Sequence, residues 1–206
     1  MSEGKITLMS SGGTSEESRP VITMQDAKDF SEAGLERMFN LEKIIKAKID
    51  ENPLFIFAQT NTITTYVIGQ LAACFEVVPL TPDKWADFRL SQLNQDLVGR
   101  KIIWINFWGD GFIESQIANG NIIPEHYIMA LCKTEEKKAE YRLAGKYVEF
   151  WFNSEMDGGI KFPECNTYHY LSKGFVPDPY FDFNYNENNC VCGYQGKTME
   201  ITQKSE

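Results

Sequence analysis

The sequence predicts an α+β fold, with two N-terminal helices packed on a mostly antiparallel sheet and an irregular, aromatic C-terminal coil. Three observations predict this class. Apolar residues recur at helical spacing over residues 23–51 and again over residues 81–97. From residue 101 onward, runs of β-branched and aromatic residues are separated by glycine-containing turns. Beyond residue 160, proline and asparagine are frequent and interrupt any regular pattern.

The first helix is expected over residues 23–51, where an apolar stripe is followed by Asn52-Pro53, a pair that disfavours further helix. The stripe consists of Leu35, Met38, Leu41, Ile45 and Ile49. The lysines of residues 43–48 are expected on the wet face of this helix. A second helix is expected over residues 81–97, with Thr81 as its N-cap, Pro82 in its first position and Gly99 at its stop.

Strands are expected at residues 54–58, 76–80, 102–108, 112–117, 127–133 and 147–153. Asn119-Gly120 is typical of a hairpin turn. A short charged helix capped by Thr134 is expected over residues 134–143. Residues 62–75 combine β-branched and helix-favouring segments, so a β-α-β start to the fold remains open.

Two regions are predicted along the chain. Residues 1–20 are rich in Ser, Gly, Thr and Glu and hold too few apolar residues to offset the entropy of ordering, so they are expected to form a flexible arm. The alternation of Ile6 and Leu8 suits a strand added to another chain or to the edge of the chain's own sheet. Residues 21–206 are expected to form a single globular domain.

Composition limits the partners and the compartment. The net charge is −9, so nucleic acid is not expected as a partner. No apolar run is long enough to span a membrane, and residues 1–18 lack the apolar core of a secretory signal. The five cysteines, an odd number, are therefore expected to be reduced thiols in the cytoplasm or another reducing compartment.

The most specific pattern for a metal is a cysteine and a histidine followed by two closely spaced cysteines. Its members are Cys165, His169, Cys190 and Cys192, all in a segment with little regular pattern. Zinc favours tetrahedral sulfur and imidazole ligands, so zinc is the expected ion. The alternative is that Cys165 and His169 lie on a strand and the other two cysteines are unrelated neighbours.

Catalytic patterns are weaker. Asp110 and Glu114 are candidate carboxylates for acid–base chemistry, but an aspartate between two glycines is also what a tight turn requires. His126 and Cys132 are a conceivable nucleophilic pair, although a buried, hydrogen-bonded histidine is the commoner outcome. The chain has no phosphate-binding loop, and residues 178–187 lack the spacing of a calcium loop.

Aromatic residues suggest the function. Adjacent aromatics in a strand point to opposite faces, so both faces of the sheet need cover from the chain's own elements or from a partner. Together with the missing catalytic motifs, this favours a non-enzymatic binding or structural subunit of a larger assembly, with other protein chains or copies of itself as partners. The alternatives are a small enzyme that uses Asp110, Glu114 or a C-terminal metal, and, third, an acidic inhibitor protein.

Overall fold

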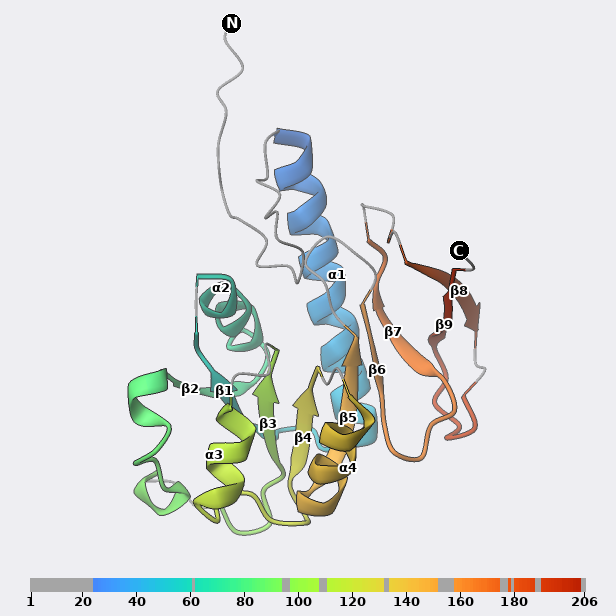
Figure 1. The fold of residues 1–206 in the computed structure, drawn as a ribbon. Coiled ribbons are helices and arrows are strands. Elements are labelled where there is room, and N and C mark those ends of the chain that lie inside the picture. The colour runs from blue at the N-terminus through green and yellow to red at the C-terminus, as the bar shows by residue number, and fades with distance from the viewer. Residues whose placement is uncertain are drawn as a thin grey trace, which may run out of the picture.

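A sheet of nine strands, in the order β2-β1-β3-β4-β5-β6-β7-β9-β8, organises the computed structural model (Figure 1). The structure describes residues 24–60, 62–93, 97–107, 111–131, 134–151, 158–174, 178, 180–187 and 190–204. Its first five strands in this order run parallel: β2 (Glu76–Leu80), β1 (Leu54–Ala58), β3 (Ile102–Asn106), β4 (Tyr127–Ala130) and β5 (Lys146–Trp151). The remaining pairings are antiparallel and add β6 (Gly158–Lys161), β7 (Tyr168–Ser172), β9 (Lys197–Gln203) and β8 (Phe181–Glu187).

The expectation of a mostly antiparallel sheet is therefore wrong, because half of the strand pairings are parallel. Parallel neighbours need a crossover between them, and helices supply it in three places. These helices are α2 (Thr62–Leu71), α3 (Phe112–Ala118) and α4 (Glu135–Ala144). The β-α-β start that the sequence left open is confirmed through β1, α2 and β2. Among the described residues, α1 precedes the strands, whereas α2, α3 and α4 alternate with them.

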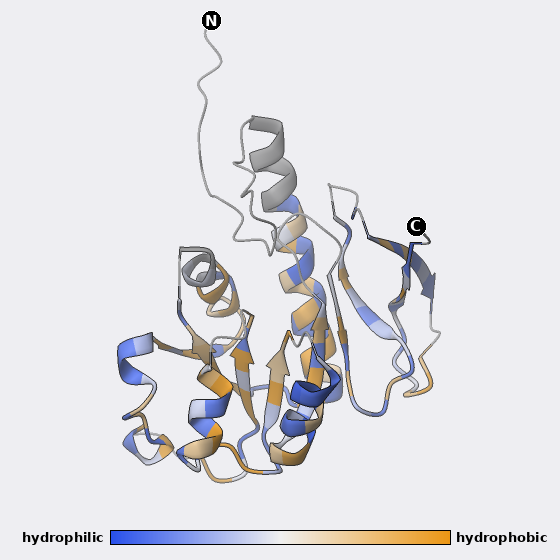
Figure 2. Ribbon diagram, viewed as in Figure 1, coloured by the Kyte–Doolittle hydropathy of each residue, from blue (hydrophilic) through white to orange (hydrophobic). Residues whose placement is uncertain are grey.

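Two apolar clusters cover the two faces of the sheet. On one face, α1 (Met24–Lys48) and α2 pack with residues such as Phe55, Ile105 and Phe150. On the other, α3 and α4 pack with residues such as Trp104 and Ile128. Figure 2 shows apolar colour along the central strands, and β1 and β3 are buried along their whole length. The chain's own helices thus cover both faces of the parallel half.

The first helix is confirmed, and it reaches the far half of the sheet. Asn40 Nδ2 donates to the Leu171 carbonyl at 2.8 Å, and Arg37 Nε donates to Ser172 Oγ at 3.1 Å. The Tyr170 hydroxyl donates to Glu36 at 2.8 Å. These contacts join α1 to β7.

The helix expected over residues 81–97 is wrong. Only two single turns of 3₁₀ helix form in the described part of this segment, Pro82–Lys84 and Leu90–Gln92, and Thr81 makes no side-chain cap bond. The reason is that side chains from α3 and the turn after it satisfy this segment's carbonyls in place of a helical ladder. Gln116 Nε2 donates to Trp85 O at 2.9 Å, and Asn121 Nδ2 donates to Phe88 O at 2.9 Å.

The strand expected over residues 112–117 is also wrong, because this segment is α3. Phe112, Ile113 and Gln116 are buried on one side of that helix, a pattern that alternation does not give. Asn119-Gly120 ends α3 and does not turn a hairpin. The Gly120 N–H donates to Ile117 O at 2.9 Å with φ at 70°, the left-handed conformation common just after a helix.

The expectation of an irregular C-terminal coil is wrong as well, because this segment forms β7, β8 and β9. Asparagine and aspartate disfavour strands in isolation, but in β8 they alternate with half-buried Phe181, Phe183 and Tyr185, and pairing with β9 along the whole strand overrides the weak propensity. This half of the sheet is curled: three strands separate β5 from β8, yet the rings of Trp151 and Phe181 are 4.9 Å apart.

Some expectations fall outside the described residues, namely the arm of residues 1–20, Asp110 and Cys132. Within the described part, no helix is both long and apolar enough to cross a membrane.

Candidate metal centre

The antiparallel half of the sheet supplies all four candidate ligands. Cys165 lies in the connection between β6 and β7, and His169 lies in β7 itself. Cys190 and Cys192 lie in the connection between β8 and β9. Because β7 pairs with β9, the two connections meet beside the same strand.

Tight turns hold the cysteines in place. The Cys165 N–H donates to Phe162 O at 3.0 Å, and the Gly193 N–H donates to Cys190 O at 3.1 Å. Gly193 has φ at 79°, which a residue with a side chain rarely adopts. The two turns are joined to each other, because the Val191 N–H donates to Asn166 Oδ1 at 3.0 Å.

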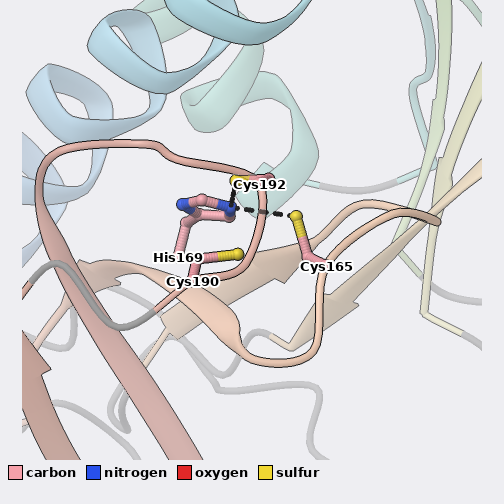
Figure 3. A group of neighbouring side chains, drawn as sticks. All are labelled: Cys165, His169, Cys190 and Cys192. Atoms are coloured by element: carbon pink, nitrogen blue, oxygen red, sulfur yellow. Dashed lines mark hydrogen bonds between the residues drawn. The ribbon is translucent and has the colours of Figure 1, made fainter.

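The four side chains point toward one another, as Figure 3 shows. One ligand atom from each lies within 4.8 Å of all the others. His169 Nε2 lies 3.2 Å from Cys165 Sγ and 3.6 Å from Cys192 Sγ. Ligands about 2.0–2.3 Å from a zinc ion stand about 3.3–3.8 Å apart at the corners of a tetrahedron, so the widest pair closes by about 1 Å to meet one ion.

The site lies at the edge of the core. His169 is fully buried, Cys165 and Cys190 are buried, and Cys192 is half-buried. The His169 ring sits against Phe162 and Tyr194, with ring centroids 5.8 Å and 4.7 Å away. Its Nδ1 has no hydrogen-bond partner among the described residues. The imidazole is therefore oriented by packing, with Nε2 directed at the sulfurs.

The pKa values of His169 and Cys192 are both lowered, and a lower pKa favours the deprotonated form that binds a cation. Burial, with a smaller contribution from Lys48, lowers the pKa of His169 to about 4, so its ring is neutral at pH 7 and has a free lone pair. Burial raises the pKa of Cys165. Burial also acts to raise the pKa of Cys192, but hydrogen bonds from the Tyr194 N–H, the neighbouring thiols and Lys48 outweigh it and lower that pKa.

Two charged residues border the centre, and the sequence did not indicate either. Lys48 Nζ lies 2.7 Å from Glu164 Oε1, and the Lys48 side chain is only 13% exposed. The expected wet face is thus wrong for Lys48. Glu164 could have been noticed because it precedes Cys165, but nothing in the sequence connects Lys48 with the C-terminal cysteines.

The candidate catalytic residues do not form a comparable site. Glu114 Oε1 accepts from the Tyr141 hydroxyl at 2.9 Å and lies 2.8 Å from Lys137 Nζ. Burial acts to raise the pKa of Glu114, but Lys137 and further hydrogen bonds lower it overall. His126 Nδ1 accepts from Trp104 Nε1 at 3.2 Å, and burial lowers its pKa. Both residues are held by structural partners.

Comparisons with known proteins add nothing to this geometry: no protein-family model, no curated protein and no solved structure matches the chain. The four convergent side chains could hold a metal ion. Among the residues that the structure describes, no other cluster of three or more His, Cys, Asp or Glu side chains could do so.

Proposed function

We propose that this chain is a zinc protein and that the ion has a structural role in the antiparallel half of the sheet. The observation that supports it is the closed donor set: three sulfurs and one imidazole nitrogen within 4.8 Å of one another. Structural zinc sites have four protein ligands of this kind, whereas catalytic sites leave one position open for water. The proposed ion joins the β6–β7 connection, β7 and the β8–β9 connection.

This half of the sheet includes a strand with little apolar burial, so a metal link would add stability there. β8 contains no fully buried residue, in contrast to β1 and β3, which are buried throughout. A strand with little apolar burial contributes little hydrophobic stabilisation. Metal binding free energy adds to folding free energy when the unfolded chain has no formed site.

Metal analysis of the purified protein tests the proposal. We expect one zinc ion per chain, and loss of most of it in Cys192→Ser, because a hydroxyl is a poor zinc ligand. A chelator should lower the melting temperature of the wild-type protein and leave that of Cys192→Ser nearly unchanged. Cys74→Ser is the matched control, because Cys74 is a free thiol outside the cluster.

Two outcomes would contradict the proposal. One is a wild-type protein that holds no zinc after purification and takes up none from zinc salts. The other is equal zinc content in Cys192→Ser and Cys74→Ser. Cobalt substitution supplies an independent readout, since thiolate-to-cobalt charge transfer appears only when cysteines bind the ion.

A second candidate function is that of an assembly subunit, and one observation on α1 favours it. Leu35 and Phe39 are one helical turn apart and are 64% and 69% exposed. We propose that these two side chains are part of a contact surface for another chain, because exposed apolar patches commonly mark protein–protein contacts. The occupant that we propose is a second copy of this chain, packed through the same face.

A further inference from the structure

The proposed zinc centre has an electrostatic imbalance that its four ligands do not correct. On binding, the three thiols lose their protons and the histidine stays neutral, so the complex of one Zn²⁺ and three thiolates has one net negative charge. The centre is largely buried, and burying a charge without a partner is costly. A cation close to the thiolates would remove this cost.

Lys48 is in the right place to do so. It is the last residue of α1, and its side chain is 13% exposed. Burial acts to lower the pKa of its ammonium, but the neighbouring Glu164 carboxylate and Cys192 thiol outweigh this and raise that pKa. Its ammonium also lies 5.6 Å from the centroid of the Phe162 ring, which in turn packs on His169. The lysine therefore reaches the centre from a helix that supplies none of the ligands.

Glu164 has the opposite effect. Its carboxylate binds the same ammonium at 2.7 Å and adjoins Cys165, so it brings a second negative charge to the border of the centre. Its side chain is 53% exposed, so water stabilises its charge in part. The Lys48 ammonium is thus ion-paired with this carboxylate and also influences the Cys192 thiol.

We infer that Lys48 is an outer-sphere positioning residue of the metal centre, which balances its negative charge and sets its zinc affinity, while Glu164 opposes it. This inference rests on the proposed zinc function and identifies how that site is regulated by its surroundings. It also makes zinc occupancy depend on α1. Outer-sphere partners of metal ligands typically change affinity by about 10- to 100-fold when they are removed.

Zinc affinity of three variants, measured by competition with a chromophoric chelator, tests the inference. Lys48→Met keeps the apolar stem and removes the charge, so we expect zinc affinity to fall by about 10-fold or more. Lys48→Arg keeps the charge and should restore most of it. Glu164→Gln frees the ammonium for Cys192 and should raise affinity by several-fold, because a like charge leaves the centre. Lys46→Met is the control, since Lys46 pairs with Glu42 at 2.7 Å.

The sign of the Glu164→Gln effect separates this role from a purely structural one. If the Lys48–Glu164 ion pair mattered only for holding the fold, both substitutions would weaken zinc binding, and that result would overturn the inference. Unchanged affinity in Lys48→Met would overturn it too. A wild-type protein that binds no zinc would instead refute the proposed function, so the two failures are distinguishable. Melting temperatures of the zinc-free variants show whether Lys48→Met still folds, and if it does not, the Glu164→Gln result decides alone.

Discussion

Gly159 in β6 occupies a position where a side chain has no room. A Cβ there would lie 2.6 Å from Met199 Cε, 3.1 Å from Tyr168 Cβ and 3.3 Å from His169 O. The sheet shifts register beside this residue, and the missing side chain leaves room for the Met199 side chain of β9 against β6. The close packing of β6 against Met199 and β7 therefore depends on a glycine at this position.

Gly159→Ala is expected to destabilise the protein by about 1–3 kcal/mol, the usual cost of overpacking a tight interior. Gly69→Ala, in the exposed part of α2 with nothing within 4 Å of its Cβ, should stabilise by about 0.5–1 kcal/mol because alanine is the better helix former. Urea unfolding of both variants measures the difference. Equal stabilities would show that Met199 and its neighbours yield without cost.

The sequence predicted which four side chains lie close together. Cysteine and histidine are recognisable as soft ligands by residue type, so the convergence of Cys165, His169, Cys190 and Cys192 could be expected without a structure, and it is confirmed. Lys48 could not be found in this way. A lysine is commonplace on a helix surface, and only the tertiary packing of α1 brings this one to the sulfurs.

Capping shows how far local signals determine an element. Thr134 and Thr81 both precede helix-favouring residues, so the sequence predicts both of them as N-caps. Thr134 Oγ1 accepts from the Lys137 N–H at 3.3 Å and begins α4, as predicted. Thr81 caps nothing, because the carbonyls after it bond to side chains of distant residues.

Thr134→Ala should therefore cost about 1 kcal/mol of unfolding free energy, the usual effect of losing an N-cap. Thr81→Ala should stay within about 0.5 kcal/mol of the wild type, as surface substitutions usually do. Chemical denaturation of the two variants checks this contrast. A larger loss for Thr81→Ala than for Thr134→Ala would contradict this account of the segment.

Elements with continuous apolar runs, such as β1 and β3, were predictable because they are buried on both faces. The helix α3 could not be predicted, because its β-branched and aromatic residues favour a strand locally. The parallel pairing of β3 with β4 requires a crossover there, and that requirement appears only at the level of the sheet.

The whole molecule combines two kinds of sheet. The parallel half is built from neighbouring β-α-β units, whereas the antiparallel half contains the candidate metal centre and the sheet edge at β8. The sequence indicated mixed helix and strand content but not this division, because each strand's direction depends on partners far away in the chain.

The proposed self-association is a property of the whole molecule, and the proposal places it on α1. If Leu35 and Phe39 face a second copy of the chain, Phe39→Glu should shift the protein from a dimer to a monomer in native mass spectrometry, because a buried, unpaired carboxylate is costly. Leu143→Glu is the control, since Leu143 is 86% exposed on α4. A wild-type protein that stays monomeric at every concentration, or equal effects of the two substitutions, would refute this interface.

The packing of α1 on β7 also has a consequence for synthesis on the ribosome. Arg37 and its partner Ser172 are 135 residues apart, and chains grow at about 5–20 residues per second, so α1 emerges on the order of ten seconds before the strand that it packs against. During that time the part of its apolar face that later contacts β7 stays uncovered. We expect this helix to be a target for chaperones on the nascent chain, and to reach its final position only after β7 has been made.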